Sequence, residues 1–569
     1  MHEPYTNWLR AGARTLLGGL LLGAALLGWT RGVSAEANSC LPPHQQDATP
    51  PPAPATAPAP ATATAPNCRY GVSASSTAAE KMAEMKIGWL VSFGPGEPGW
   101  LPAGTAHTPM IRLKQDRHAD TNARLPTYTA NPALTANSLG SLIAANPGAV
   151  WIVGNEVDRV QWQDDLMPEI YAVAYHDAYQ FIKSQDPTAQ VAVSALVQVS
   201  PGRLQYLDKV VAAYRERYGS PMPVDAWTFH AYIFPERNDD YYTTGENGEQ
   251  ILDPESGKPV FAWIANGTDP ALALKKPFWK RPLAEQRELC ARSDYSCIYE
   301  HDKIDLFAQQ LIDMRTWMKA NGYQRTPLLL TEWSLLYEYK VAEETGVCSV
   351  KDEFGNCFTP ARTTEFLHSS IQYMETASDP NLGYPLDNNR LVQQWSWFAM
   401  DDLGGGIFTD GNPSLLVDPG SGELTQAGEE FRALIAQSTT QPNLVIDEVL
   451  GGTASLHPEN GTATAQLKVR VRNNGNTPTT VPFKVEFYRG TNAADVIGES
   501  VVPAGLDGCA VVEAVAEVTW AGLTAPLNTF TVAVDPDNAA GSSGSASSRR
   551  TSSFVLVDPS VLYLPTLLR

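Results

Sequence analysis

The sequence predicts an α/β fold, a (β/α)8 TIM barrel, followed by a smaller all-β, immunoglobulin-like sandwich. Short apolar runs alternate with amphipathic helical stretches over about 360 residues, which indicates a parallel sheet. After residue 441 the pattern changes to short strands separated by turns, as in a sandwich. The chain has 569 residues and 43% hydrophobic content, so it can bury sizeable cores and is not wholly disordered.

The charge balance limits the classes of partner. The chain has 62 acidic and 41 basic residues, a net charge of -21. A nucleic-acid-binding protein needs a basic surface, so no nucleic-acid partner is expected. The same balance argues, more weakly, against a strongly anionic substrate.

The first 35 residues are predicted to be a signal peptide. Arg10 and Arg14 precede the apolar run Leu16–Trp29, and Val33–Ala35 supplies small residues for cleavage. The run is shorter than the roughly 20 residues that a membrane-spanning helix needs. We therefore expect export to the outside or to the cell surface. The alternative is an uncleaved N-terminal anchor.

Residues 36–80 are predicted to be a linker. Pro50–Pro66 contains seven prolines in 17 residues and is otherwise almost only Ala and Thr. Such a tract cannot build a core and favours extended polyproline II structure. A stalk of this kind is typical of an exported domain held away from a cell surface.

The seven cysteines suit an exported protein. Two pairs are close in sequence and are predicted to form local disulfides: Cys290 with Cys297, and Cys348 with Cys357. Cys40 and Cys68 bracket the proline tract, and a bridge between them would leave Cys509 unpaired. Sequence alone does not decide the connectivity. Neither close pair matches zinc-ligand spacing, so no metal is predicted.

The barrel is assigned to residues 81–440. Strands are predicted at Lys86–Ser92, Pro109–Lys114, Ala149–Asn155, Gln190–Val197, Val224–His230, Pro327–Glu332 and Leu391–Trp397, with Leu125–Thr129 as a weaker third strand. Helices are predicted at Pro168–Gln185, Arg203–Tyr218, Asp302–Asn321, Thr363–Ala377 and Thr425–Ala436. An open Rossmann-type sheet is the alternative. It is disfavoured because Pro98 and Gly99 follow the glycine-rich turn Phe93–Gly96, where a helix should begin.

Three further segments complete the predicted organisation. Residues 234–302 are too long for a simple loop and are expected to form an insertion over the barrel mouth. Residues 441–559 form the sandwich, and residues 560–569 are a tail. The predicted sandwich strands are Gln466–Arg472, Phe483–Tyr488, Val511–Trp520 and Phe530–Val534. Because such a sandwich has its own core, a cut near Gln441 is expected to leave a folded barrel.

Two glutamates end predicted strands. Glu156 follows the apolar run that starts at Ala149, and Glu332 follows Leu328–Thr331. Catalytic side chains of barrels come from the C-terminal ends of strands. A glutamate in this position cannot stay unpaired in the core, so it emerges at the mouth or takes a partner. Two carboxyl groups facing one pocket are what glycosidic bond cleavage requires.

Gly154–Glu156 and Thr331–Trp333 resemble the strand-four and strand-seven motifs of the retaining (β/α)8 glycoside hydrolases called clan A, or the 4/7 superfamily. The resemblance implies that Glu156 is the acid/base and Glu332 the nucleophile, with no cofactor. The residues it places around the substrate are Arg112, Asn155, His230, Tyr232, Trp395 and Trp397. Asn155 would bind the sugar 2-hydroxyl, and Arg112 would hold Glu332 ionised. The Glu332 carboxylate is expected to raise the pKa of Glu156.

The sequence departs from this family at Val157, where the clan usually has proline. Other roles stay open for several residues: Arg112 as a structural salt-bridge partner, His230 as a barrel histidine, and one of the two tryptophans as plain core. Trp162, Trp263 and Trp279 are candidate sugar platforms or local anchors. The sandwich, through Arg470–Gly475 and Val534–Asn538, looks like CARDB-type adhesion modules.

The sequence therefore predicts an exported retaining glycoside hydrolase that cleaves O-glycosidic bonds of a polysaccharide or oligosaccharide. The alternative is a barrel without catalysis that binds glycan at a cell surface, with the sandwich as an adhesion module. No obligate protein partner is evident.

Overall fold

The computed structural model describes residues 65–555, except 160–162, 236–280, 293–295, 343–346, 404–411, 439, 458–461, 492–493, 510–512, 524–526 and 543–548. The predicted signal peptide, the proline-rich tract, the greater part of the predicted insertion and the tail lie outside the described residues. Cys40, Trp162, Trp263 and Trp279 do so too. Among the residues described, no helix is both long enough and apolar enough to span a membrane.

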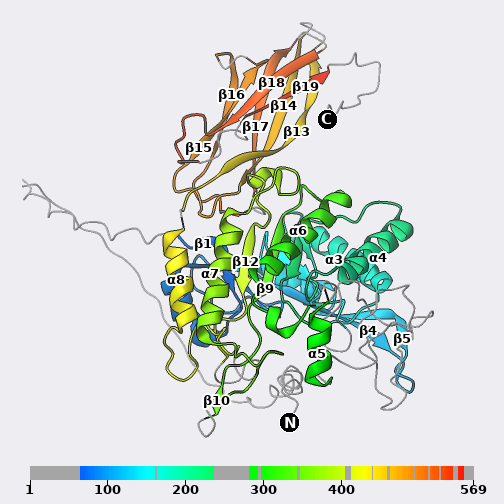
Figure 1. Cartoon of the computed structure of the whole chain (residues 1–569). Helices are drawn as coiled ribbons and strands as arrows, with labels where there is room; N and C mark the ends of the chain where they lie inside the picture. Colours follow the sequence, from blue (N-terminus) through cyan, green and yellow to red (C-terminus); the bar gives the residue numbers. More distant parts are fainter. Residues whose placement is uncertain are drawn as a thin grey trace, which may run out of the picture. The chain divides into compact units, whose positions relative to one another are not determined.

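Two sheets form the α/β region, residues 67–438 (Figure 1). Their strands are β1 (Asn67–Val72), β2 (Ile87–Val91), β3 (Ala106–Thr108), β4 (Met110–Arg117), β5 (Arg124–Asn131), β6 (Val150–Val153), β7 (Gln190–Val193), β8 (Trp227–His230), β9 (Leu328–Trp333) and β12 (Gln394–Trp397). One sheet has the order β3-β2-β1-β12-β9-β8 and is parallel throughout. The other has the order β5-β4-β6-β7, in which only the β4–β5 pair is antiparallel.

Two connections join these sheets. Only Pro109 separates β3 from β4, so one stretch of chain contributes to both. At the other side, Ala192 in β7 forms a parallel bridge with Ala226, directly before β8. A short antiparallel pair, β10 (Val341–Ala342) and β11 (Val347–Cys348), lies outside both sheets.

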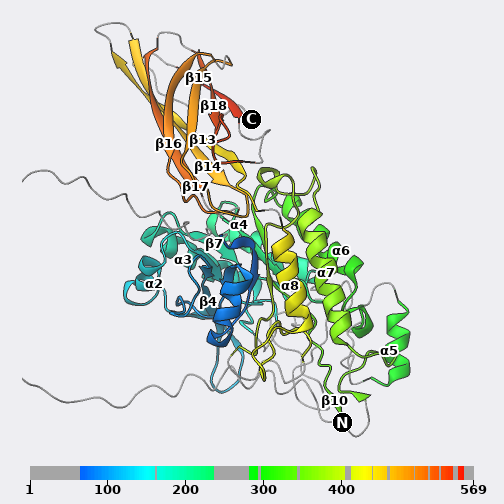
Figure 2. The same cartoon turned by 90° about the vertical axis from the view of Figure 1, so that its left-hand side faces the viewer.

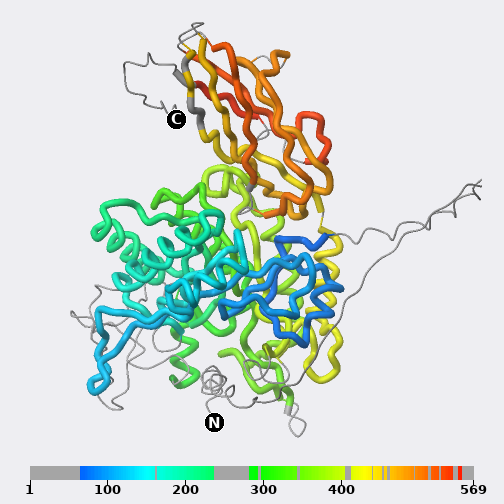
Figure 3. The backbone as a smooth tube through the Cα atoms, turned by 180° about the vertical axis from the view of Figure 1, so that it is seen from behind, coloured from blue at the N-terminus to red at the C-terminus, as the bar shows by residue number. Residues whose placement is uncertain are grey.

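Two strand predictions are corrected. Asn67–Val72 forms β1, so the predicted linker of residues 36–80 is wrong from Asn67 onward. Leu125–Thr129 lies in β5, which pairs antiparallel with β4 in a hairpin (cyan in Figure 3) and is not a parallel third strand. β1 adds one parallel strand before Glu156, and the reassignment of Leu125–Thr129 removes one, so the number of parallel strands before each glutamate does not change. With β3 and β4 counted as one strand interrupted at Pro109, β6 is still the fourth and β9 the seventh parallel strand among the described residues.

The five predicted helices are confirmed, with small shifts at their ends. The helices are α1 (Ala79–Met85), α2 (Ser141–Ala145), α3 (Pro168–Gln185), α4 (Pro201–Tyr218), α5 (Leu283–Cys290), α6 (Ile304–Ala320), α7 (Pro360–Thr376) and α8 (Gln426–Gln437). α4 shows why the sequence can predict where a helix begins and ends. The Ser200 side chain caps its start, Pro201 is its first residue, and Gly219 with φ 70° ends it. α7 and α8 pack side by side (Figure 2).

The parallel strands β1, β2, β6, β7, β8, β9 and β12 are almost wholly buried on both faces, whereas the hairpin strand β5 is not buried. One face, with Trp89, Met110, Ile152, Ala192 and Leu329, forms a compact apolar cluster between the strands. The opposite face packs with the helices in a much larger core. Successive side chains of a strand point to opposite faces, so the position of a residue in the strand decides which core it joins.

The C-terminal β region begins after residue 440 and has two antiparallel sheets around one apolar core. Its strands are β13 (Leu444–His457), β14 (Thr462–Asn473), β15 (Phe483–Arg489), β16 (Val496–Val502), β17 (Glu513–Leu523), β18 (Leu527–Val534) and β19 (Arg549–Val555). The sheet orders are β13-β14-β17 and β16-β15-β18-β19. The four predicted strands are confirmed, while β13, β16 and β19 were not predicted.

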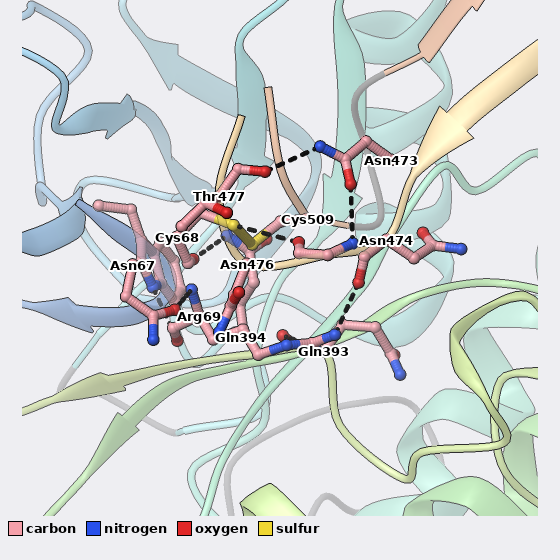
Figure 4. Close-up of a disulfide and its surroundings, with 12 residues drawn as sticks. Asn67, Cys68, Arg69, Gln393, Gln394, Asn473, Asn474, Asn476, Thr477 and Cys509 are labelled. Carbon is pink, nitrogen blue, oxygen red and sulfur yellow. Dashed lines mark hydrogen bonds between the residues drawn. A yellow bond between two sulfur atoms is a disulfide. The ribbon is translucent and has the colours of Figure 1, made fainter. Parts of the chain in front are cut away.

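A disulfide joins the two regions. Cys68, in β1, is bonded to Cys509 in the β region (Figure 4), so the alternative of a Cys40–Cys68 bridge with Cys509 unpaired is wrong. The backbone NH of Cys68 also donates to the Asn476 carbonyl at 3.0 Å. The local bridges Cys290–Cys297 and Cys348–Cys357 are confirmed.

Arg69, next to that disulfide, forms a buried ion pair with Asp387. Its guanidinium donates to both Asp387 oxygens at 2.9 and 2.7 Å, and to the Asn474 carbonyl of the β region at 2.8 Å. A cut near Gln441 would remove Cys509 and this carbonyl together. That such a cut leaves a folded barrel stays a prediction, and the loss of these contacts is what the barrel would have to tolerate.

We expect Arg69→Ala to lower the free energy of unfolding by about 3–5 kcal/mol, because it leaves the buried Asp387 charge with only the longer contacts to Arg390 at 3.8 Å and Gln393 at 3.4 Å. Asp387→Ala should cost a similar amount, and the double change should cost less than the sum. Denaturant unfolding of the intact chain measures all three. Arg432→Ala, at an exposed ion pair on α8, is the control and should change stability little. Additive losses would show that Arg69 and Asp387 act separately.

Candidate active site

A tight turn at the end of β6 presents the first glutamate. Gly154 has φ 92°, and a Cβ atom there would lie 2.7 Å from Cγ1 of Val157, so the turn needs glycine. Glu156 has φ 45°, an uncommon conformation for a residue with a side chain, and it is buried. Val157 is buried as well, and its carbonyl accepts from Leu166 NH at 2.9 Å. Valine in place of the family's proline thus still leaves the glutamate at the strand end.

Asp164 ties this turn to the neighbouring strand. One of its carboxylate oxygens accepts from the backbone NH groups of Asn155 and Leu113, each at 2.8 Å. The other accepts from Arg112 Nε at 2.7 Å. Burial raises the pKa of Asp164, and the Arg112 charge opposes that rise. Sequence reasoning missed Asp164, whose signal was an acidic residue eight positions after Glu156.

Arg112 is therefore held by Asp164, and its Nη2 donates to Gln163 at 2.9 Å. This is the structural salt-bridge role left open above. It is not the expected contact that would hold Glu332 ionised.

His230, at the end of β8, lies between the two glutamates. Its Nδ1 is 3.1 Å from Glu156 Oε1, and its Nε2 is 3.5 Å from Glu332 Oε1. One oxygen of each glutamate and one ring nitrogen all lie within 4.8 Å of one another. The Tyr232 hydroxyl donates to Glu332 Oε2 at 2.9 Å. The structure thus brings together Glu156, His230, Tyr232 and Glu332, all of which are buried.

Arg159 completes the cluster and was not predicted. Its Nη1 donates to Glu156 Oε2 at 2.9 Å. The Arg159 side chain is 32% exposed, whereas the Glu156 side chain is only 4% exposed. The guanidinium therefore covers the solvent side of the glutamate. Its position three residues after Glu156 was the signal available in the sequence.

These contacts separate the two glutamates electrostatically. Burial works against ionisation of Glu156, but the charge of Arg159 and the hydrogen bond with His230 outweigh it and lower its pKa to about 2. Burial and the nearby Glu156 charge raise the pKa of Glu332 to about 7, although His230 opposes the rise. In this state, the expectation of a raised Glu156 pKa is wrong. Burial lowers the pKa of His230, but the two glutamates more than compensate, so its pKa is raised.

Glu156, His230 and Glu332 have the atom types that bind metal ions. It therefore matters which of their oxygen and nitrogen atoms are free of hydrogen bonds. Glu156 Oε1 and Oε2 face His230 and Arg159, and Glu332 Oε2 accepts from Tyr232. Only Glu332 Oε1 and His230 Nε2 are left without a hydrogen bond within this cluster. A metal usually takes three or more protein ligands. Fewer than three ligand positions of this cluster are therefore free of hydrogen bonds among the described residues.

The remaining predicted residues divide into two groups. The Asn155 Oδ1 atom is buried and has no hydrogen-bond partner among the described residues, so it is free to accept from a ligand hydroxyl. Trp395 and Trp397 are fully buried in the core between β12 and the helices. Trp395 packs edge-on against Tyr70, and Trp397 against Trp333. The predicted substrate-binding role of the two tryptophans stays a prediction, because both rings are packed against other aromatic side chains in this structure.

Comparison with known proteins gives only distant likenesses. No family model matches the chain, and no curated protein sequence matches it. A glucosidase from Croceicoccus marinus is similar with a TM-score of 0.35 and 12% identity, over 81% of this chain and 95% of the glucosidase. A β-glucuronidase from Bacteroides uniformis is similar with a TM-score of 0.32 and 9% identity, over 84% of this chain and 43% of the glucuronidase. A CARDB domain from Pyrococcus furiosus is similar with a TM-score of 0.16 and 17% identity, over 21% of this chain and 96% of that domain.

We expect Glu332→Gln to stabilise the protein at high pH. A folded-state pKa of about 7, against 4.5 for an ordinary glutamate, means that ionising Glu332 opposes folding. The wild type should therefore lose stability as the pH rises from about 4.5 to about 7, and this contribution of Glu332 should be absent from the variant. The difference should reach about 3 kcal/mol at pH 8. Urea unfolding across this pH range measures it, with exposed Glu216→Gln on α4 as the control. A difference that does not vary with pH would contradict the raised pKa.

Proposed function

We propose that the protein is a glycoside hydrolase of the retaining type, acting on O-glycosidic bonds of a polysaccharide or oligosaccharide. The observation that carries the proposal is the pair of buried glutamates at the ends of β6 and β9, with carboxylate oxygens within 4.8 Å of each other. Retaining enzymes have their two carboxyl groups about 5–5.5 Å apart, whereas inverting enzymes need about 6.5–9.5 Å to admit a water. The close approach supports the retaining geometry.

The fold proposed with this function is a complete (β/α)8 barrel of the 4/7 type. The Ala192–Ala226 bridge and the passage from β3 into β4 support closure, because they connect the two sheets at both sides. With that closure, Glu156 and Glu332 follow the fourth and the seventh strands. For the β region, we propose an immunoglobulin-like module of the CARDB type.

The proposed mechanism has two displacements. In the first, an oxygen of ionised Glu332 forms a bond with the anomeric carbon while the bond from that carbon to the leaving oxygen breaks. Protonated Glu156 gives its proton to the leaving oxygen. In the second, Glu156 takes a proton from water, the water oxygen bonds to the anomeric carbon, and Glu332 is released. The Tyr232 hydroxyl is placed to stabilise negative charge on Glu332, and Asn155 Oδ1 to accept from a sugar hydroxyl.

We further propose that the protein is exported and acts outside the cell or at its surface. Its three disulfides are compatible with an oxidising compartment. The predicted signal peptide and stalk agree with this location.

A second candidate function is glycan binding without catalysis. The observation that favours it is Arg159, which occupies the Glu156 oxygen that a proton donor would use. Turnover of a panel of aryl glycosides separates the two functions. Hydrolysis supports the enzyme, and polysaccharide binding without hydrolysis supports the binding protein.

We expect Glu156→Ala and Glu332→Ala to fail differently. Without the general acid, substrates with poor leaving groups should be hydrolysed about 10²–10⁴-fold more slowly. Dinitrophenyl glycosides, which need no proton, should still react, and added azide should yield a glycosyl azide of retained configuration. Glu332→Ala should be nearly inactive on all substrates, with azide giving the inverted product.

Exposed Glu365→Ala on α7 is the matched control and should keep wild-type turnover. Product configuration is read by NMR. If the Glu332 variant gave a glycosyl azide of retained configuration, the roles of the two glutamates would be the reverse of those proposed. Unchanged turnover in both variants would place the site elsewhere.

A further inference from the structure

The proposed mechanism needs a protonated Glu156, but the Arg159 guanidinium contacts its carboxylate. Glu156 has a donor on each carboxylate oxygen: His230 Nδ1 at Oε1 and Arg159 Nη1 at Oε2. A carboxyl group with a cationic guanidinium on one oxygen and an imidazole on the other is favoured in its ionised form, so it is a poor proton donor in this arrangement. The structure therefore shows a resting arrangement with Glu156 ionised, and Glu156 becomes a better acid when the charge of a donor moves away.

We propose that Arg159 is a positioning residue that keeps Glu156 ionised in the substrate-free protein, and that a bound substrate displaces it so that the single proton of the pair passes from Glu332 to Glu156, which leaves Glu332 ionised. This inference rests on the proposed function for its second half only. Its first half concerns the protein without substrate and can be tested without turnover.

Arg159, rather than His230, is the donor that can leave. His230 is 1% exposed and lies between the two glutamates, so its ring has no room to move away. The Arg159 side chain is about one-third exposed, and among the described residues its guanidinium contacts only Glu156. A long side chain with one contact at the solvent side can turn outward into water, where its charge is hydrated.

The other charged and titratable groups facing Glu156 do not replace Arg159. His230 on β8 is shared with Glu332, so its charge serves both carboxyl groups. Glu332 on β9 and Asp158 are acids and favour protonation of Glu156. The cation on the α4 side, Arg203, is paired with Asp158 at 2.5 Å. Tyr232 donates to Glu332. Arg159 is thus the cation that decides whether Glu156 holds its charge.

Removing the cation should move the pH dependence of the free enzyme. In Arg159→Gln, both limbs of the kcat/KM profile should shift upward by about one pH unit or more, because a nearby positive charge no longer favours the ionised pair. The kcat profile, which reports the substrate complex, should shift much less, since Arg159 has already left. Arg159→Lys keeps the charge and should restore the wild-type limbs.

A substrate-free measurement keeps the inference separate from the proposed function. Infrared titration of the carboxyl band in Glu332→Gln, with Glu156→Gln/Glu332→Gln subtracted, follows Glu156 alone. Adding Arg159→Gln should raise the pH at which Glu156 protonates by about one unit or more. Arg432→Gln is the matched control, because Arg432 also pairs with a glutamate three residues away, Glu429, but at an exposed position.

The outcomes are distinct. No shift of the infrared titration in Arg159→Gln overturns the inference, even if the enzyme hydrolyses glycosides. An infrared shift in a protein without any turnover supports the resting role of Arg159 and counts against the proposed function. Equal shifts of the kcat/KM and kcat profiles would overturn displacement by substrate. If Arg159→Gln lost activity but the acid and base limbs of its kcat/KM pH profile did not shift, Arg159 would have only a structural role.

Discussion

The candidate site depends on the burial of two carboxyl groups so close together that they cannot both be ionised at low cost. Glu156 and Glu332 share His230, and their oxygens lie within 4.8 Å. The surrounding groups decide where the single charge resides: Arg159 and His230 favour it on Glu156, while Tyr232 supports Glu332 with one hydrogen bond. A pair that shares one proton can serve acid and nucleophile chemistry, but in this resting state the charge lies on Glu156, and the proposed mechanism needs it on Glu332.

The framework around the pair is built to hold strand ends in place. Asp164 connects the Glu156 turn with β4 through two backbone hydrogen bonds and the Arg112 ion pair. In the first strand of the α/β region, Cys68 and Arg69 attach that strand to the β region. The β region therefore takes part in fixing a strand of the same sheet that carries Glu332.

Local patterns in the sequence were sufficient for the helices and most parallel strands, because apolar periodicity and capping residues act over short distances. They also placed both glutamates at strand ends. β1 was missed because Asn67–Val72 directly follows the proline tract, and β5 was misassigned because a hairpin strand and a barrel strand have the same alternation. Periodicity shows that Trp395 and Trp397 share a face of β12 but not which face meets a ligand, so the sequence could not foresee that both pack in the core.

The contacts that set the charge state were the hardest to foresee. Arg159 and Asp164 lie within a few residues of Glu156, yet only the folded turn shows that one covers the carboxylate and the other holds the backbone. The Cys68–Cys509 bridge joins residues 441 positions apart, a pairing that spacing rules cannot supply.

Covalent labelling tests the central claim, a double displacement through Glu332, most directly. The protein is incubated with the 2-deoxy-2-fluoro glycoside of whichever sugar the aryl glycoside panel shows to be turned over, and its peptides are mapped by mass spectrometry. The account predicts one fluorosugar per chain, attached to Glu332. A label on Glu156, or glycoside turnover with no covalent label on either glutamate, would contradict it.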